Sequence, residues 1–524
     1  MKGSRANSPD LSLHTRIALK LRGLMQTSNA DCSRLFCALL LGASFLLFGL
    51  HYVHLKADFP HFSPWPDPAR TTDEGWYAGA ALRHYLSGGW LEPGDFNPAV
   101  AVPVFPAFAG VLFHFTGVSI VALRAMNVTF FGASLVAVWL LVRRYSHPLA
   151  AAGAVFLVAC CPFYYAYSRL GTVEPLLSLE NLLALLAASS ITRNNSHLSY
   201  KLPSLAVGVL LAAMIFTKTP GLCLWPAVFY LMASRCHFNF REYVRPAALA
   251  GGVAMIIAVG YRAMIVRAGL VPDFDNLFAI NRGRIHGRIL LSTLWAVAKE
   301  GSTMGPVFYY VATAAILLVV LVRRNRQSPL FVASILGVAG YGAFITYHGW
   351  LMTRYYVVPM PLVAMALASA LAVLAQSRAL PLCLISGVLT TVLLFSCLGQ
   401  IHTMLVWMRN PSYSFYQASA AIYRIIDRDP SKNRVVLGAS SEQVALLTDE
   451  PGIFVNQTFG TVGLRTRVLT LKPGWFIDFD GVGPETLSAL QGLESVQFVD
   501  SEPAFGDDGI HYQLLLYKLT PIHP

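Results

Sequence analysis

Long runs of apolar residues without charges limit what this chain can fold into more than any other feature. Of its 524 residues, 55% are hydrophobic and 13% are charged, whereas a soluble domain usually carries about 25% charged residues. A run of roughly 18 or more apolar residues is long enough to cross a bilayer as a helix. The apolar blocks are 35–55, 99–117, 120–142, 148–167, 175–192, 202–217, 220–234, 246–266, 303–322, 328–347, 355–375 and 380–400. The sequence therefore predicts an all-α polytopic membrane domain.

Composition divides the chain into three parts. Residues 1–34 are polar and basic, which predicts a cytoplasmic N-terminal segment. The run 35–55 is too long for the core of a usual signal peptide and lacks a clear cleavage site, so we expect an uncleaved first span. Residues 35–400 form the predicted transmembrane domain. In residues 401–524 the charges and turn residues are spread out, which predicts a small soluble domain.

Basic residues in short loops orient a membrane protein, because they stay on the cytoplasmic side. If every apolar block crossed the membrane, Arg143, Arg144 and all later basic clusters would lie outside. Block 99–117 contains Pro103 and Pro106, and proline removes helix hydrogen bonds that lipid cannot replace. We therefore expect this block to lie along the outer surface or to dip in and return. About 11 spans plus membrane-surface helices then remain.

This topology places loops 56–119 and 267–302 and the C-terminal domain on the extracytoplasmic side of the cell inner (plasma) membrane. The net charge of +12 does not indicate a nucleic-acid partner, because the basic residues sit mainly in short loops and form no aromatic-interleaved stripe. The cysteines lie in or beside apolar blocks, so we expect neither a disulfide framework nor a cysteine zinc site. No cofactor and no metal site are predicted.

The first outer loop contains an acidic pair followed by aromatic residues. Asp73 and Glu74 precede Trp76 and Tyr77 at the start of an amphipathic stretch over residues 78–90. On local evidence alone, such acids can equally begin a solvated helix, where the helix dipole favours them. In an enzyme, a carboxylate at this position can act as the general base on an acceptor hydroxyl.

Further charged residues gather on the same predicted side. They are Arg169 and Glu174 at the start of one span, Lys218 between two short spans, Arg354 with Tyr355 at the start of a late span, and Arg282, Arg284, His286 and Arg288 in the loop 267–302. Charges at a membrane boundary are costly unless they are paired, hydrated or used, so ordinary ion pairing and loop solvation remain alternatives. The basic loop breaks the positive-inside pattern, which suggests an anion to hold, because arginine grips phosphate through paired hydrogen bonds.

An acidic loop and several cations at one outer face fit one reaction class. A sugar donor linked to a lipid phosphate releases an anionic phosphate, and cations stabilise this charge as it develops. The acceptor needs a base, for which Asp73 is the candidate.

At this point the sequence resembles the GT-C glycosyltransferases, in the branch of protein O-mannosyltransferases, the lipid A aminoarabinose transferase and related bacterial lipopolysaccharide sugar transferases. The similar motifs are Asp73-Glu74 with Tyr77 (the acidic first-loop motif), residues 97–117 (the proline-rich surface segment), Arg124, Ser168-Arg169 with Glu174 (the second-loop motif, where many members have Asp) and Arg354-Tyr355 (the opening of a late span). The resemblance covers about residues 35–400.

The resemblance implies a GT-C fold, a polyprenyl-phosphate-linked sugar donor, inversion of the anomeric centre, and a lipid, glycan or protein acceptor. It places the catalytic base on Asp73. The residues expected to bind substrate are Glu74, Tyr77, Arg169, Glu174, Lys218, Arg282, Arg284, Arg288, Arg354 and Tyr355.

The C-terminal segment alternates between helix and strand patterns. Helices are predicted over 412–427, 442–447 and 485–493, and strands over 435–438, 452–456, 475–480, 496–499 and 511–519. Such alternation predicts a small α/β layer domain. Neither a phosphate loop nor a nucleophile elbow is present, and only its position suggests that the domain caps the site or recognises the acceptor.

Two other functions explain part of the sequence. A secondary transporter would account for the many spans, but it predicts an internal repeat and broken helices at mid-membrane, and no repeat between the halves is evident. A non-catalytic membrane scaffold with a soluble binding domain would account for the C-terminal domain. It gives no reason for Asp73 beside a basic outer surface.

The topology yields a direct prediction about Asp73 and Arg354. Single cysteines placed at these two positions are expected to react with a membrane-impermeant maleimide from the same, outer side. Labelling from opposite sides of the bilayer would exclude a common site and with it the enzyme hypothesis.

Overall fold

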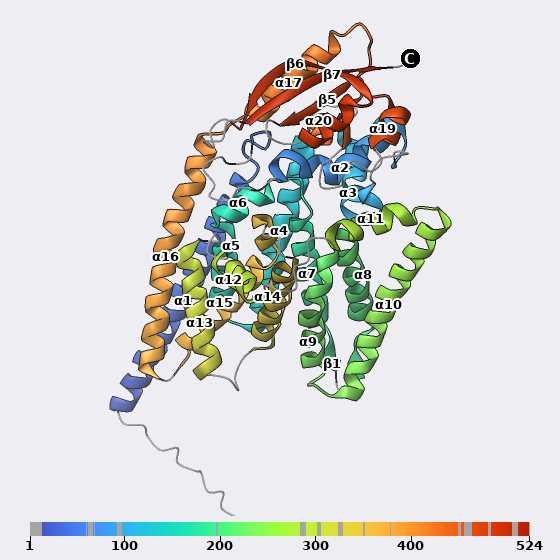
Figure 1. Cartoon of the computed structure of the whole chain (residues 1–524). Helices are drawn as coiled ribbons and strands as arrows, with labels where there is room; N and C mark the ends of the chain where they lie inside the picture. Colours follow the sequence, from blue (N-terminus) through green and yellow to red (C-terminus); the bar gives the residue numbers. More distant parts are fainter. Residues whose placement is uncertain are drawn as a thin grey trace, which may run out of the picture.

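The structure is a computed structural model of the 524-residue chain. It describes residues 13–58, 60, 67, 69–91, 97–194, 197–282, 290–300, 305–322, 328–348, 352–377, 379–448, 452–454, 464–479, 484–505 and 512–522. A bundle of apolar helices carries a small domain with a five-stranded sheet at one end (Figure 1). The predicted fold class, a helical membrane domain followed by a small α/β domain, is confirmed.

The bundle is built from helices of unequal length. They are α1 (Leu13–Leu50), α4 (Ile120–Tyr145), α5 (Pro148–Ala159), α6 (Pro162–Ser168), α7 (Glu174–Ser189), α8 (Lys201–Thr217), α9 (Trp225–Arg235), α10 (Phe240–Arg267), α13 (Pro306–Val322), α14 (Pro329–His348), α15 (Met360–Ala375) and α16 (Leu380–Arg409). Two short helical turns precede bundle helices: η2 (Thr219–Leu224) comes before α9, and η5 (Thr353–Val357) comes before α15. A β1–β2 hairpin (Thr192–Asn194, His197–Ser199) comes before α8. Among the described residues, six helical segments are long and apolar enough to cross a bilayer, or seven if α5 and α6, bent by 64°, form one span. The expectation of about 11 spans stays a prediction.

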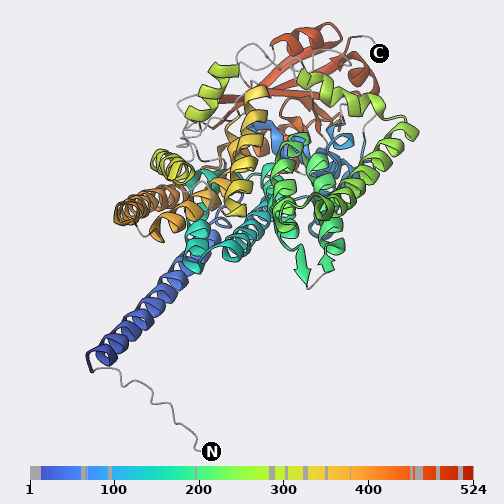
Figure 2. The ribbon, with the colours of Figure 1, turned by 90° about the horizontal axis from the view of Figure 1, so that it is seen from below.

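Apolar side chains cover the outside of the bundle as well as its core. Leu46 on α1, Ile256 on α10 and Phe395 on α16 are all exposed in the protein alone. Figure 2 shows α1 and α10 at opposite sides of the bundle. A helix that is hydrophobic all round needs either a protein core or lipid around it, and these exposed faces are therefore lipid-facing. The protein is a multi-pass membrane protein.

A layer of short helices covers the end of the bundle that carries the C-terminal domain (Figure 1). It consists of α2 (Ala69–Ser87), η1 (Pro98–Val100) and α3 (Val104–Thr116). With 13 residues, α3 spans about 20 Å, which is shorter than the roughly 30 Å of a hydrocarbon core. Phe105, Ala109 and Phe113 recur every four residues and pack in one cluster with α2. This length is in line with the expectation that block 99–117 does not cross the membrane, which stays a prediction.

The second outer loop forms two helices, α11 (Val271–Arg282) and α12 (Leu290–Glu300). The Asn97 amide donates a hydrogen bond to Asp273 Oδ1 at 3.0 Å, which joins α11 to the first outer loop. The Tyr356 hydroxyl donates to the Val297 carbonyl at 2.9 Å, which joins α12 to η5. The loop 267–302 therefore contacts both the first loop and η5.

The C-terminal domain has the predicted alternation of helices and strands. Its elements are α17 (Ser414–Asp427), β3 (Val436–Gly438), α18 (Ser441–Thr448), β4 (Gly452–Phe454), α19 (Leu464–Leu471), β5 (Trp475–Phe479), α20 (Pro484–Gln491), β6 (Glu494–Ala504) and β7 (Tyr512–Pro521). The sheet order is β4-β3-β5-β7-β6, with β3 parallel to β4 and β5, and β7 antiparallel to β5 and β6. Only α19 has no counterpart among the predicted elements.

Side-chain periodicity explains how this domain closes. On α17, Phe415, Ala418, Ile422 and Ile426 recur at helical spacing and are buried against one face of the sheet. On β5, alternate residues pack with α17, while Phe476 packs with α19 and α20 on the other face. Each face of the sheet thus has its own apolar core, as the period of two in a strand requires.

The membrane domain extends further than the sequence blocks indicate. Helix α16 continues to Arg409, so residues 401–409 of the segment assigned to the soluble domain prolong the last membrane helix. The C-terminal domain then folds back over the bundle, and α18 packs against α2. Because α18 directly follows β3, the carboxyl end of this strand lies next to the acidic first loop.

Candidate functional site

A buried guanidinium group gathers three carboxylates at the end of the bundle that carries the C-terminal domain. Arg354 Nη1 lies 2.7 Å from Asp67 Oδ1, its Nη2 lies 2.7 Å from Asp73 Oδ2, and its Nε lies 3.4 Å from Glu174 Oε1. The backbone N–H of Arg354 also donates to Asp67 Oδ2 at 3.2 Å. We call Asp67, Asp73, Glu174, Lys218 and Arg354 the acidic cluster. It joins the first loop to the start of a span 287 residues later.

Each member of the acidic cluster sits at or near a helix end. Asp73 lies in the first half of α2, Glu174 is the first residue of α7, Lys218 separates α8 from η2, and Arg354 lies in η5. A carboxylate at a helix N-terminus is stabilised by the helix dipole, and Pro175 fits there because the first turn needs no N–H donor from it. The breaks between helices therefore put charged groups at the outer end instead of in the lipid.

Lys218 is the second cation of the acidic cluster. Its Nζ pairs with Glu174 Oε1 and lies 4.1 Å from the centre of the Tyr355 ring, a cation–π contact. Three carboxylates therefore face two cations, so the cluster holds one more negative charge than positive when all groups are ionised. Mutual repulsion among the carboxylates is thus only partly balanced.

Solvent access separates the members of the acidic cluster. The side chain of Asp73 is 16% exposed and that of Lys218 12%, whereas Asp67 and Glu174 are 1% exposed. Burial raises the pKa of Asp73 above the usual carboxyl value; the positive charge of Arg354 opposes this rise, and the negative charges of Asp67 and Glu174 add to it. Asp73 is therefore the most accessible carboxylate of the cluster and the one prepared to accept a proton.

Polar atoms without a partner mark where a bound molecule would make its hydrogen bonds. In the described part of the chain, Glu174 Oε2 and the Tyr341 hydroxyl are buried and have no hydrogen-bond partner. Tyr341 is close enough to Glu174 and Arg354 to interact with both charges. Burial raises the pKa of Tyr77 well above its usual value, so its hydroxyl remains protonated as a donor beside Asp73. Orphaned buried groups of this kind call for a ligand or water.

Glu74 points away from the acidic cluster and ties the outer segments together. Its carboxylate accepts two hydrogen bonds from Arg124, at 2.8 Å from Nε and 2.6 Å from Nη2. It also accepts from the Gly171 N–H at 2.7 Å and from the Gln443 amide at 2.8 Å. Arg124 donates further to the carbonyls of Leu55 and Ala57. With both oxygens engaged and no solvent exposure, Glu74 acts as an internal tether, although the sequence suggested a substrate contact.

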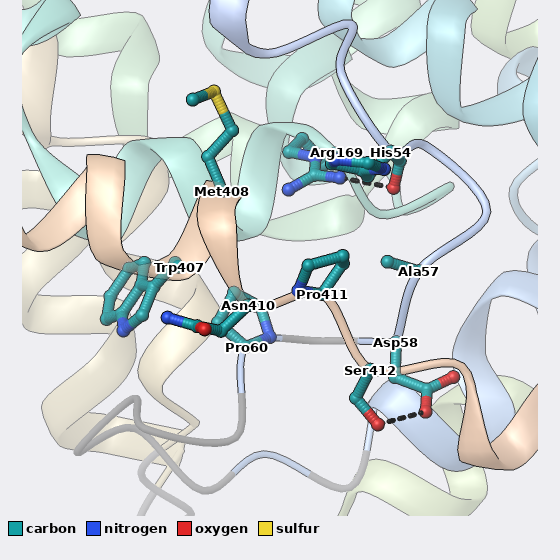
Figure 3. Close-up of a pocket in the computed structure, with 10 residues that line it drawn as sticks. All are labelled: His54, Ala57, Asp58, Pro60, Arg169, Trp407, Met408, Asn410, Pro411 and Ser412. Carbon is teal, nitrogen blue, oxygen red and sulfur yellow. Dashed lines mark hydrogen bonds between the residues drawn. The ribbon is translucent and has the colours of Figure 1, made fainter.

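Arg169 also lies apart from the acidic cluster. In the described part of the chain its guanidinium donates to the Val53 and His54 carbonyls at 2.8 and 2.5 Å and to the Tyr165 hydroxyl at 2.7 Å. It lines a cleft between the first outer loop and the end of α16 (Figure 3). The cleft residues are His54, Ala57, Asp58, Pro60, Arg169, Trp407, Met408, Asn410, Pro411 and Ser412. The structure thus separates Arg169 from Glu174, although the two are neighbours in one sequence motif.

The three basic residues proposed in the second outer loop cannot be placed in either group. Arg284 and Arg288 lie outside the described residues, and Arg282 ends α11 with its side chain outside the described part. Of the remaining predicted residues, Asp73, Glu174, Lys218, Arg354, Tyr355 and Tyr77 are brought together.

Asp67 and Gln443 were missed by the sequence analysis. Asp67 stands between Pro66 and Pro68, a context that keeps the backbone out of a helix, and this was the one local signal available. Its partner Arg354 is too distant in sequence for pairing to be inferred. Gln443 carries no motif, and only the docking of α18 on α2 reveals its contact with Glu74.

Comparisons with known proteins identify related chains. Residues 98–261 match the family model described as dolichyl-phosphate-mannose-protein mannosyltransferase. This segment contains Arg124, Glu174 and Lys218, and it excludes Asp73 and Arg354. No curated protein sequence matches the chain.

Solved structures match over most of the length. ArnT from Cupriavidus metallidurans bound to undecaprenyl phosphate matches with a TM-score of 0.62 at 14% identity, over 91% of this chain and 97% of that chain. The apo state of the same protein gives a TM-score of 0.59 with the same coverage. The oligosaccharyltransferase from Archaeoglobus fulgidus, in complex with Zn and sulfate, gives a TM-score of 0.52 at 13% identity, over 84% of this chain and 67% of that chain. These likenesses establish the fold.

The tether role of Glu74 predicts a stability effect. Arg124→Met removes one partner of a buried ion pair and leaves the Glu74 charge uncompensated, which costs about 3–5 kcal/mol. We expect a lower unfolding temperature in detergent for Arg124→Met, and partial recovery in the Arg124→Met/Glu74→Gln double variant.

Arg143 on the same helix is exposed and provides the matched control. Arg143→Met is expected to leave the unfolding temperature unchanged. An Arg124→Met protein as stable as the parent would show that the pair does not hold the outer segments together.

Proposed function

We propose that this chain, a multi-pass membrane protein with the GT-C fold, is an inverting glycosyltransferase that moves a sugar from a polyprenyl-phosphate donor to a lipid, glycan or protein acceptor. The relationship to GT-C glycosyltransferases predicted from the sequence is confirmed by the family-model match and by the solved structures. The observation that carries the proposal is the position of Asp73: a partly exposed carboxylate of raised pKa that pairs with Arg354, in a cluster that Lys218 joins through Glu174.

The donor class follows from the charges and from the relatives. ArnT is described with undecaprenyl phosphate bound, and the lipid-facing helices of this chain give a polyprenyl tail a place beside the site. Lys218 is the more exposed of the two cations in the acidic cluster, so it is the group best placed to meet a phosphate arriving from outside. Arg282, Arg284 and Arg288 are proposed as further phosphate contacts by their positions in the sequence alone.

The reaction is a single displacement. The acceptor hydroxyl oxygen forms a bond to the anomeric carbon while the bond between that carbon and the phosphate oxygen breaks. Asp73 takes the hydroxyl proton, and the electron pair of the broken bond stays on the polyprenyl phosphate, where a cation stabilises it. Attack opposite to the leaving phosphate inverts the anomeric centre.

The other members of the acidic cluster would hold Asp73 and the sugar in place. Arg354 fixes the orientation of the Asp73 carboxylate through its Nη2. Glu174 Oε2, which is buried and unpartnered in the described residues, is proposed to accept a hydrogen bond from a sugar hydroxyl. Tyr77 and Tyr355 border the same group of charges and are proposed to contact the sugar. Fixing reactants in this way removes much of the entropic cost of the reaction.

The helix that carries Asp73, α2, lies at the end of the bundle next to the C-terminal domain (Figure 1). We place this end outside the cell inner membrane and the N-terminus in the cytoplasm, because the basic loops at the other end follow the positive-inside pattern. Arg169 belongs to a separate cleft, and a role in orienting the acceptor there is part of the proposal.

Replacement of the proposed base gives the first test. With a panel of polyprenyl-phosphate sugars, the purified protein is expected to form a glycosylated product, and Asp73→Asn is expected to lower the rate about 10²- to 10⁴-fold. Asp427→Asn, which changes an exposed carboxylate of the C-terminal domain, serves as the control. Product formation by Asp73→Asn at a rate near that of the parent would remove Asp73 from the reaction.

The pH profile gives a second test. Asp73 must be ionised to accept a proton, so kcat/KM falls as pH falls through its pKa. Because this pKa is raised, the acid limb of the profile is expected above the ordinary carboxyl value of about 4.

The Thr72 hydroxyl donates to Asp73 Oδ1 at 3.0 Å and favours the ionised form. Thr72→Val, which keeps the shape, is therefore expected to move the acid limb upward by less than about one pH unit while the plateau rate is retained. An acid limb of the kcat/KM profile at the pH expected for a free carboxyl group, in both the parent and Thr72→Val, would contradict the assignment of Asp73 as the base.

A further inference from the structure

The C-terminal domain approaches α2 along the face of that helix that carries Gly75 and Gly79. Gly75, Gly79 and Arg83 recur every four residues and therefore lie on one face. A Cβ atom at Gly75 would lie 2.1 Å from the Gln443 backbone nitrogen, and one at Gly79 would lie 2.3 Å from Glu442 Oε1. Such distances leave no room for a side chain at Gly75. The start of α18 is thus seated directly on the backbone of α2.

The Gln443 amide makes two hydrogen bonds next to the proposed base. Its Nε2 donates to Glu74 Oε2 at 2.8 Å, and its Oε1 accepts from the Gly75 N–H at 2.7 Å. Glu74 and Gly75 are the two residues that follow Asp73 in α2. Gln443 is 1% exposed, so both hydrogen bonds are shielded from water and each is costly to lose. An ion pair between Glu442 Oε1 and Arg83 Nη1 at 2.5 Å extends the contact by two turns of α2.

A second set of contacts holds the chain before Asp67. The Asp58 carboxylate accepts hydrogen bonds from the Ser414 hydroxyl at 2.9 Å and from the Phe415 N–H at 3.1 Å, at the start of α17. The Asp58 N–H donates to the Ser412 carbonyl at 2.8 Å. The Arg70 guanidinium lies 4.7 Å from the centre of the Phe505 ring. The C-terminal domain therefore contacts the first loop both before Asp67 and after Asp73.

We propose that the C-terminal domain is the positioning element of the acidic first loop and that Gln443 is the positioning residue for Asp73. Asp73 lies in α2, and among the described residues its ion-pair partner is Arg354 of the membrane domain, so the placement of α2 decides whether Asp73 reaches the acceptor hydroxyl. A displacement of about 1 Å from the productive geometry is enough to slow an enzyme about 100-fold. This inference rests on the proposed function of Asp73.

Substitution of Gln443 tests the proposal. Gln443→Leu removes both hydrogen bonds at similar size, and Gln443→Glu keeps the acceptor for Gly75 but places a second carboxylate against Glu74. Both are expected to lower kcat about 10- to 100-fold while the KM for the polyprenyl-phosphate sugar changes little. The acid limb of the kcat profile is expected to move to higher pH, since Asp73 loses part of its contact with Arg354.

Gln497, exposed on β6, gives the matched controls Gln497→Leu and Gln497→Glu, which should retain the kcat and pH profile of the parent. Hydrogen–deuterium exchange of full-length protein in detergent measures positioning without turnover. Exchange across residues 69–87 should be faster in Gln443→Leu, and exchange across 475–479 should stay slow, which shows that the C-terminal domain is still folded.

These measurements separate the two proposals. Faster exchange in α2 with a lower kcat supports the positioning role. Unchanged exchange in α2 of the Gln443 variants overturns the positioning role. So does an unchanged kcat and pH profile of these variants when the parent protein is active. If the parent forms no product with any polyprenyl-phosphate sugar, the proposed function fails. The exchange result alone then shows whether Gln443 holds α2 in place.

Discussion

The ion pairs of Arg354 are the constraint on which the end of the bundle beneath the C-terminal domain depends. One guanidinium at the start of a span faces Asp67 and Asp73 from the first loop and Glu174 at the start of α7. Its planar fork can satisfy several carboxylates at once, which a lysine cannot do. Without this cation, Lys218 would be the remaining cation of the cluster beside three neighbouring carboxylates, and unbalanced buried charge is expensive. The site therefore forms only when segments from the beginning, middle and end of the bundle meet.

A second buried ion pair, Glu74 with Arg124, is formed by the residue that follows Asp73 in α2. Neighbouring carboxylates on one helix thus have opposite roles: Asp73 faces Arg354 and is partly accessible, whereas Glu74 is enclosed by Arg124, Gly171 and Gln443. The tether links α2 to the membrane domain on one side and to the C-terminal domain on the other. This arrangement explains why a soluble domain without a recognisable catalytic motif is placed over the bundle: it completes the surroundings of the acidic loop.

Much of the fold and part of the site could be predicted, and the particular residues show where prediction ended. Apolar blocks and the later alternation of helix and strand patterns predicted a helical membrane domain and an α/β domain at the end. Glu174, Lys218 and Arg354 were named because charge at a membrane boundary needs a reason, and Asp73 because a carboxylate in the first loop can act as a general base. Arg169 was grouped with Glu174 because the two are close in sequence, yet the turn between α6 and α7 sends them to different places. Asp67 was missed because its meaning depends on a partner in a distant span.

The sequence by itself determined which segments leave water and which charges must remain near it, because the transfer of apolar and charged groups between water and lipid depends on composition alone. It also determined the alternation of helix and strand near the end of the chain. Only the tertiary structure decided which carboxylate faces which cation, how far α16 extends, and that Gln443 contacts the helix of Asp73. Those outcomes depend on distances of a few ångströms between segments hundreds of residues apart, and local periodicity carries no information about such distances.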